Sequence, residues 1–88
     1  MVSQVRRSAV SIPANIVEGH KRSSTKDFCH FLNIAETSLE ETKYHLLLSK
    51  DLIYLKEIPY NELLNLCEEI GKMLNAIQKK LSYSSTRN

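Results

Sequence analysis

The sequence has no tryptophan and only two residues each of glycine, proline and cysteine among its 88 residues. An all-β sandwich or barrel needs a turn signal about every 8–12 residues, and so little glycine and proline does not supply them. Straight-chain residues such as Leu, Glu and Lys are abundant instead, and these lose little rotamer freedom in a helix. The composition therefore predicts an all-α fold and excludes an all-β one.

Long apolar runs are also absent. The longest aliphatic run is Leu46–Leu48, whereas a membrane span needs about 20 residues. Residues 1–17 are basic and free of acids, as in a transit peptide, but Ser11, Pro13 and Asn15 interrupt the apolar stretch that a secretory signal requires. We therefore expect a soluble, cytoplasmic protein with no membrane association.

The two cysteines, Cys29 and Cys67, close at most one disulfide. A domain of this length buries only about 60–65% of the surface of its unfolded chain, so a monomer has little stability to spare. Association with further copies is the expected source of additional stability.

Apolar side chains recur at alternating spacings of three and four residues in three segments, which is the period of an amphipathic helix. The three stripes are Val2, Val5, Ala9, Ile12 and Ile16; Phe28, Leu32, Ala35, Leu39, Thr42, Leu46, Ser49 and Ile53; and Leu63, Leu66, Ile70, Leu74, Ile77 and Leu81. These spacings predict one domain over residues 1–88 with helices over 2–18, 25–55 and 60–81. Residues 82–88 are expected to form a frayed polar tail.

Punctuating residues refine the expected helix ends. The first stripe stays in phase across Pro13, which predicts one bent helix rather than two short ones. Gly19 is expected to adopt a positive φ just past the end of that helix. Ser24 or Thr25 caps the second helix, and Pro59 pushes Ile58 out of the helical region before the third.

The second helix is long for its neighbours if each helix folds back on the one before. We expect the first helix to cover its early half and the third helix its late half and part of its middle. Apolar residues near its carboxyl end then face more than one direction: Leu47, Leu48, Leu52, Ile53, Tyr54 and Leu55. Another helix or another subunit is expected to cover them.

A polar ribbon runs beside the first stripe. Arg7, Ser11, Asn15 and Glu18 recur at spacings of four, four and three. We expect the ribbon to meet Ser38 and Glu41 of the second helix in a structural hydrogen-bond network that includes an Arg–carboxylate pair. A binding surface is the alternative.

No pattern indicates catalysis, a cofactor or a metal. Cys29 and His30 are adjacent and therefore point about 100° apart on a helix. His20 is expected in a loop, and His45 and Cys67 have no ligand three or four residues after them. Phosphate loops, nucleophile elbows and zinc-protease motifs are missing from the sequence. We expect a protein that is not an enzyme.

Charge divides the chain into three parts. Residues 1–26 hold five cations against Glu18, residues 27–71 hold three lysines against nine acids, and residues 72–88 hold four cations and no acid. An antiparallel arrangement brings the two basic parts together, where they could hold phosphates; a solvated basic rim is the alternative. Candidate ligands of RNA or DNA are Arg6, Lys21, Arg22, Lys26, Lys79 and Lys80. Aromatic residues are not interleaved with them, which disfavours base reading.

Residues 3–19, SQVRRSAVSIPANIVEG, carry a family resemblance. They resemble the first block of the four-helix bundle proteins encoded in intervening sequences of bacterial 23S rRNA genes, and the accessory variability determinant proteins of diversity-generating retroelements are similar. The matching positions are Gln4, Arg6, Arg7, Ser11, Ile12, Asn15, Glu18 and Gly19, then Ala35, Ser38, Leu39 and Glu41. Thr37 stands where that family usually has glycine.

The resemblance implies an up-and-down bundle of the four-helix type, with three helices in this chain. The family's N-terminal helix is absent or shortened here, because Met1 is only three residues before Gln4. It also implies a homo-oligomer, a pentamer by likeness to the accessory variability determinant proteins, which associate with a reverse transcriptase and nucleic acid. The expected function is a non-catalytic, oligomeric nucleic-acid-binding or adaptor protein; the alternative is a structural protein-interaction module that binds no nucleic acid.

Overall fold

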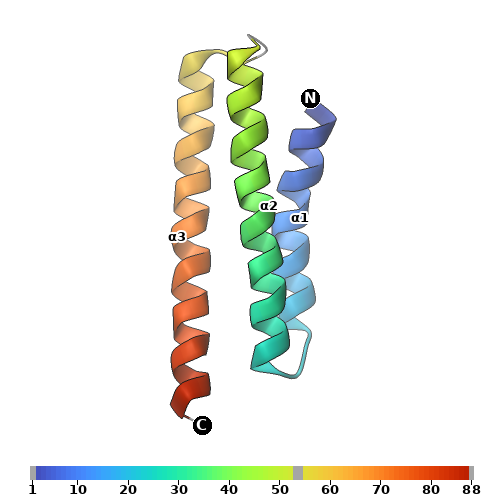
Figure 1. Cartoon of the computed structure of the whole chain (residues 1–88), viewed down its shortest axis with the longest axis vertical. Coiled ribbons are helices and arrows are strands. Elements are labelled where there is room, and N and C mark those ends of the chain that lie inside the picture. Colours follow the sequence, from blue (N-terminus) through green and yellow to red (C-terminus); the bar gives the residue numbers. More distant parts are fainter. Residues whose placement is uncertain (1, 53–54, 88) are drawn as a thin grey trace.

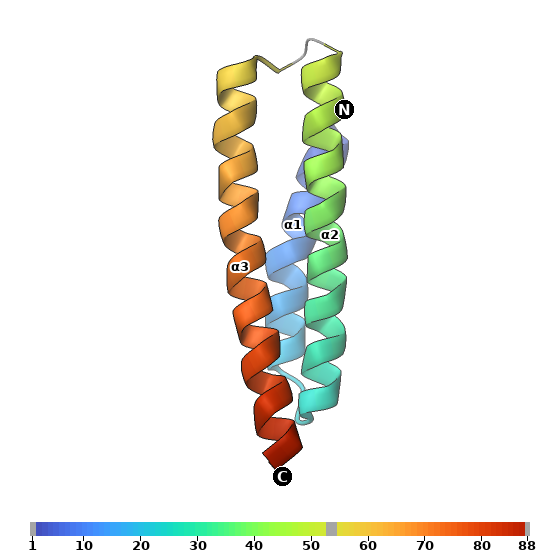
Figure 2. The ribbon, with the colours of Figure 1, turned by 60° about the vertical axis from the view of Figure 1, so that its left-hand side comes forward.

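A computed structural model shows that the described part of the chain folds into three antiparallel helices (Figures 1 and 2). The structure describes residues 2–52 and 55–87, and the side chains of residues 3–52 and 55–81. The helices are α1 (Val2–His20), α2 (Thr25–Asp51) and α3 (Glu57–Arg87). The predicted all-α, up-and-down helical fold is confirmed.

Helix α1 continues through Pro13 as a single helix, in agreement with the unbroken phase of its apolar stripe. The prediction for Gly19 is wrong, because this residue lies within α1 and not beyond its end. Gly19 is buried, and a Cβ atom there would lie 2.7 Å from Cβ of Phe31 and 2.8 Å from Cδ1 of Phe28. Close approach to α2, rather than backbone conformation, requires the glycine.

Ser24 caps α2, since its side chain accepts a hydrogen bond from the backbone N–H of Asp27. The helix ends at Asp51, four residues before the predicted end, and the N–H of Leu52 donates to the carbonyl of Leu48. The exposure predicted near this end is present for Leu47 and Leu52, whereas Leu48 and Leu55 are half-buried and Leu55 packs against the apolar cluster. Ile53 and Tyr54 were part of that prediction and lie outside the described residues.

Helix α3 begins before the proline that was expected to precede it. Pro59 lies in the first turn, where a missing N–H costs little, and the N–H of Tyr60 donates to the carbonyl of Lys56. At its other end α3 continues to Arg87, so the predicted frayed tail over 82–88 is helical through residue 87. No proline or glycine interrupts residues 82–87, which explains the continuation.

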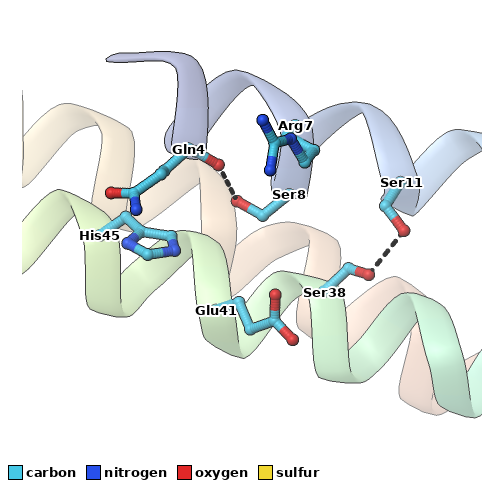
Figure 3. Close-up of a pocket in the computed structure, with 7 residues that line it drawn as sticks. All are labelled: Gln4, Arg7, Ser8, Ser11, Ser38, Glu41 and His45. Atoms are coloured by element: carbon cyan, nitrogen blue, oxygen red, sulfur yellow. Dashed lines mark hydrogen bonds between the residues drawn. The ribbon is translucent and has the colours of Figure 1, made fainter. Parts of the chain in front are cut away.

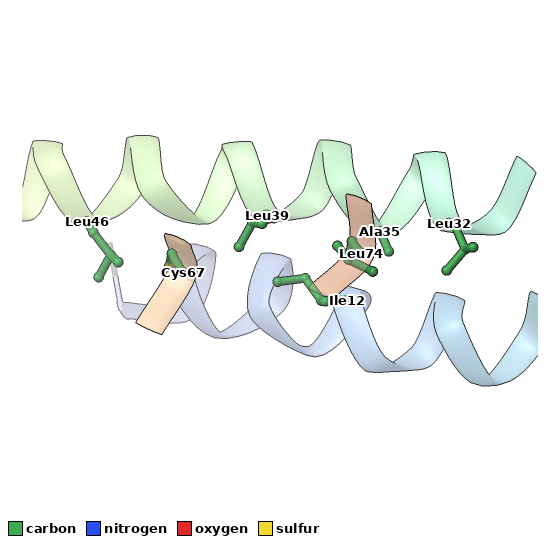
Figure 4. Packing of buried hydrophobic residues seen from close by; sticks show 7 residues of the cluster. All are labelled: Ile12, Leu32, Ala35, Leu39, Leu46, Cys67 and Leu74. Carbon is green, nitrogen blue, oxygen red and sulfur yellow. The ribbon is translucent and has the colours of Figure 1, made fainter. Parts of the chain in front are cut away.

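Helix α2 lies between the other two, and one apolar cluster joins all three helices (Figure 4). Leu32, Leu39 and Leu74 are almost completely buried in it. Helix α3 follows the whole of α2 and not only its late half, since Gln78 Nε2 donates to Asn33 Oδ1 at 2.7 Å, near the start of α2. The cluster consists of Ile12, Leu32, Ala35, Leu39, Leu46, Cys67 and Leu74.

Within the described residues, no Cα atom of α1 approaches one of α3 within 8 Å. The bundle measures 50 × 20 × 13 Å along its principal axes, and its radius of gyration is 14.8 Å. A compact chain of this length would have a radius of gyration of about 12 Å. Over the residues that the structure describes, the molecule is therefore a long, open-sided bundle, in which α2 packs against both α1 and α3.

Candidate functional site

A polar groove of about 380 Å³ lies between α1 and α2 (Figure 3). Four of its residues belong to the ribbon and its expected partners, namely Arg7, Ser11, Ser38 and Glu41. The full lining is Gln4, Arg7, Ser8, Ser11, Ser38, Glu41 and His45. Since none of these side chains is aliphatic, the groove can hold polar groups through hydrogen bonds.

Hydroxyl groups form the floor of the groove. Ser38 Oγ lies 2.8 Å from Ser11 Oγ, and the Asn15 amide donates to Ser11 Oγ at 2.9 Å and to Ser11 O at 2.7 Å. One turn away, buried Thr42 Oγ1 lies 3.0 Å from Ser8 Oγ. The expected hydrogen-bond network between the helices is therefore present for Ser11, Asn15 and Ser38.

Ser8 and Thr42 are members of this network that the sequence reasoning missed. Ser8 Oγ also lies 3.1 Å from the carbonyls of Gln4 and Val5, and Thr42 Oγ1 lies 2.8 Å from that of Ser38. Thr42 was counted as part of an apolar stripe. A buried hydroxyl such as that of Thr42 needs a hydrogen-bond partner. Ser8, four residues before Ile12 on α1, is that partner.

The predicted Arg–carboxylate pair is not formed in the described part of the chain. Arg7 and Glu41 line opposite sides of the groove, and no ion pair joins them within 4 Å (Figure 3). Glu18 does not join the network either. Its carboxylate lies 3.6 Å from Lys21 and 3.6 Å from Arg22, because these residues follow it by three and four positions.

His45 closes one end of the groove, and its Nδ1 atom is buried without a hydrogen-bond partner. No groove hydroxyl in the described residues donates to it, so no Ser–His pair of the kind that activates a nucleophile is present. The groove can bind a polar group, and within the described residues its serine hydroxyls hydrogen-bond to other groups rather than to His45.

The basic end of the bundle is built by residues from two distant segments: Lys21, Arg22, Lys26, Lys79 and Lys80. The α1–α2 turn and the carboxyl end of α3 lie at the same end of the molecule in both views (Figures 1 and 2). The hydrogen bond between Gln78 and Asn33 sets the level of Lys79 and Lys80, about two turns of helix from Lys26. All five side chains are exposed.

Arg22 is held over the ring of Phe31, with the guanidinium carbon 5.0 Å from the ring centroid. Phe28 and His20 pack in a T-shaped arrangement with ring centroids 5.9 Å apart. These aromatic contacts fix the turn that carries Lys21 and Arg22. Because Arg22 of the same chain covers one face of the Phe31 ring, that face is not free to stack on a base.

Arg6 does not join the basic end. The contact between Ser8 and Thr42 places the start of α1 beside the late part of α2. Arg6 therefore lies roughly 25 Å along the bundle from Lys26, at 1.5 Å of rise per residue. Five of the six candidate cations lie at one end, and the sixth, Arg6, lies near the other end of α1 and does not line the polar groove.

Neither a metal centre nor a membrane span is found in the described residues. In residues 2–52 and 55–87, no three His, Cys, Asp or Glu side chains gather closely enough to hold a metal ion. Within the same residues, no helix has the combination of length and hydropathy needed to cross a membrane.

The fold and its surfaces define an all-helical bundle protein with a polar interhelical groove and a basic end. Comparison with protein families identifies the group: residues 1–76 match the 23S rRNA-intervening sequence protein family, and the chain belongs to it. No curated protein sequence matches the chain.

The structure is also similar to a solved one. That protein, from Bacteroides thetaiotaomicron, is described as belonging to the S23 ribosomal protein family and having unknown function. The TM-score is 0.84 with 39% sequence identity, over 88% of this chain and 71% of the other. The likeness supports the helical fold, and that description names no activity.

Proposed function

We propose that this chain is a non-catalytic, oligomeric cytoplasmic protein that binds RNA or DNA through its basic end. The observation that carries the proposal is that two basic segments more than 50 residues apart in the chain lie at the same end of the bundle, one with Lys21, Arg22 and Lys26 and the other with Lys79 and Lys80. Cations gathered on one surface attract the phosphate backbone without regard to base sequence.

The amino end of α2 strengthens this surface. It lies at the basic end, where the helix dipole favours an anion; the Ser24 side chain already accepts from the N–H of Asp27, and the Asp27 carboxylate offsets part of this effect. Single-strand binders stack bases on exposed aromatic side chains, whereas the five basic-end residues are all lysine or arginine. We therefore expect binding governed by charge, with little preference for base sequence.

Oligomerisation completes the proposal. One copy presents five cations, and several copies in a symmetric assembly present that patch repeatedly, so weak phosphate contacts add through multivalency. The resemblance noted above implies five copies and a reverse transcriptase as a partner. An assembly that holds both an enzyme and its nucleic acid would act as an adaptor.

Fluorescence anisotropy with labelled single-stranded RNA and duplex DNA tests nucleic-acid binding. The variant carries K21Q, R22Q, K26Q, K79Q and K80Q, and the matched control is Arg6→Gln, which removes one exposed cation remote from the basic end. The proposal predicts strong loss in the first variant and near-normal binding in the control. Equal binding by wild type and the five-site variant would show that the basic end is not the interface.

A protein-interaction module without nucleic-acid binding is the second candidate, favoured by the pairing of Glu18 with both Lys21 and Arg22. The negative charge of Glu18 offsets part of the positive charge that Lys21 and Arg22 give to the turn. The module predicts that a protein partner co-purifies equally well with wild type and with a variant carrying Gln at Lys21, Arg22, Lys79 and Lys80. Nucleic-acid binding that disappears in that variant counts against it.

A further inference from the structure

The polar groove between α1 and α2 opens on the side of the bundle that faces away from α3. Lys43, which contacts Glu68 of α3, lies about 160° around α2 from the groove residue Glu41. All the described residues that line the groove belong to α1 or α2, and the ribbon of α3 passes behind them (Figure 3). A small molecule can therefore enter the groove from solvent without any movement of α3.

The two serines on the groove floor, Ser11 and Ser38, have one unused hydroxyl hydrogen between them. They share a single hydrogen bond of 2.8 Å, which consumes one of their two hydrogens. Ser11 Oγ also accepts from the Asn15 amide at 2.9 Å. Within the described residues neither hydroxyl donates to any further acceptor. This serine pair can therefore donate one hydrogen bond to a ligand in the groove.

The other lining side chains form two further levels of the groove. The hydrogen bonds between the floor hydroxyls fix the register of the antiparallel helices. By that register Arg7 and Glu41 lie within about 3 Å of the same height, about 6 Å along α1 from the serine pair. Gln4 and His45 lie opposite each other about 5 Å further on. The polar side chains thus line a length of about 10 Å, which suits a small extended molecule.

The middle level presents opposite charges from opposite walls. The guanidinium of Arg7 comes from α1 and the carboxylate of Glu41 from α2, and neither has an ion-pair partner within 4 Å in the described part of the chain. A simple anion bound to Arg7 would be repelled by Glu41, and a simple cation bound to Glu41 would be repelled by Arg7. A nucleobase would also need a broad apolar surface to stack on, and no lining side chain is aliphatic. A molecule that carries both charges complements both walls.

We propose that the groove binds a free α-amino acid in its zwitterionic form. The α-carboxylate accepts hydrogen bonds from Arg7 and from the serine pair, and the α-ammonium group donates to Glu41. The side chain of the ligand then extends to the level of Gln4 and His45. His45 Nδ1 is buried there without a hydrogen-bond partner, so a polar side chain fits this level best.

This site is separate from the basic end and goes beyond the nucleic-acid binding proposed above. Ser38 lies about 18 Å along α2 from Lys26, and none of the five basic-end residues lines the groove. Arg7→Gln should therefore leave RNA binding near normal, and the five-site glutamine variant should bind an amino acid as wild type does. Failure of one proposal thus leaves the other standing.

Nuclear magnetic resonance titration of the isotope-labelled full chain with L-glutamine gives the first test, because its side-chain amide reaches the level of Gln4 and His45. Backbone amide signals of residues 4–11 and 38–45 should shift. N-acetyl-L-glutamine lacks the ammonium group and L-glutaminamide lacks the α-carboxylate, so each should bind at least about tenfold more weakly. L-norleucine tests the side chain, and binding as tight as that of L-glutamine would contradict its placement beside His45.

Charge-removing variants identify the two walls. R7Q and E41Q should each weaken L-glutamine binding by about tenfold or more. The matched controls are R6Q and E36Q, which remove an exposed charge of the same sign from the same helix outside the groove. All four side chains are exposed, so helical circular dichroism should be unchanged.

Combining variants with ligands assigns each contact. R7Q should weaken L-glutamine but not weaken L-glutaminamide further, because that ligand has no α-carboxylate to lose. In the same way E41Q should leave the binding of N-acetyl-L-glutamine unchanged. The proposal is overturned if the groove signals do not move at about 10 mM L-glutamine, or if R7Q and E41Q bind it as tightly as wild type.

Discussion

Gly19 sets how closely α1 and α2 can approach. Gly19→Ala is expected to lower the free energy of unfolding by about 1–3 kcal/mol, because the added Cβ would lie 2.7 Å from Cβ of Phe31. Neither that atom nor the backbone behind it can rotate away. Chemical denaturation of the purified protein measures the change.

Gly71 provides the matched control, since a Cβ there would meet only Leu39 Cδ2, at 3.4 Å. It lies within α3, where alanine gains about 0.5–1 kcal/mol of helix stability over glycine. Gly71→Ala should therefore be neutral or stabilising. If both substitutions had the same effect, helix propensity and not the contact with Phe31 would explain Gly19.

The two cysteine thiols should differ in reactivity. Cys67 is 7% exposed, and burial raises its pKa, whereas Cys29 is partly exposed. Because the thiolate is the reactive form, a thiol reagent at pH 8 should modify Cys29 first and Cys67 only as the chain opens. Mass spectrometry of peptides over time checks the order. Equal rates in the folded protein would contradict the burial of Cys67.

At the scale of elements, Lys43 ties α2 to α3. Its ammonium lies 2.9 Å from Glu40 on its own helix and 3.5 Å from Glu68 on α3. The hydrogen bond to Glu40 is the main reason that the pKa of Lys43 is raised above 10.5. A cation whose folded pKa is raised stabilises the fold below its unfolded pKa, and this contribution is lost as the pH rises through the folded pKa.

Lys43→Gln is therefore expected to cost about 0.2–1 kcal/mol at neutral pH, the usual range for exposed pairs. The difference from wild type should shrink above pH 10.5. Lys43→Arg is the control, because a guanidinium stays charged there. Thermal unfolding from pH 7 to 11 measures this. If the difference in stability between Lys43→Gln and wild type persisted unchanged at the highest pH, the charge of Lys43 would not be its cause.

The three helices were predictable because their apolar residues repeat at spacings of three and four. The positions of the helix ends were less predictable. Helix α3 was expected to fray at Ser82 because the following residues are polar, yet polarity alone does not stop a helix that lacks proline and glycine. Gly19 matched the usual signal for a helix terminus, and only tertiary contact with α2 reveals its other role.

The candidate site was predictable in part. The spacing of Ser11 and Asn15 placed them on one face, and Ser38 was the expected partner. The register between α1 and α2 decides where Arg6 lies, and charge counting contains no information about register. Glu18 was expected across the interface, but cations three and four residues away on its own segment are nearer.

For the whole molecule, the account depends on an open bundle that binds nucleic acid at its basic end and repeats that end in an assembly of several copies. A variant that remains monomeric should lose multivalent binding and should retain weak, salt-sensitive binding. If the monomeric variant bound RNA as tightly as wild type, repetition of the basic end would contribute nothing.

The salt dependence of RNA binding tests the central claim most directly. Each phosphate that a cation neutralises on a single strand contributes about −0.7 to the slope of log K against log salt concentration. If each of the five cations of one copy neutralises one phosphate, the slope is about −3.5, and several copies make it steeper. The slope should fall toward zero in the five-site glutamine variant and remain steep in Arg6→Gln. Absence of binding at about 50 mM salt, or affinity unchanged up to about 200 mM, would contradict nucleic-acid binding through the basic end.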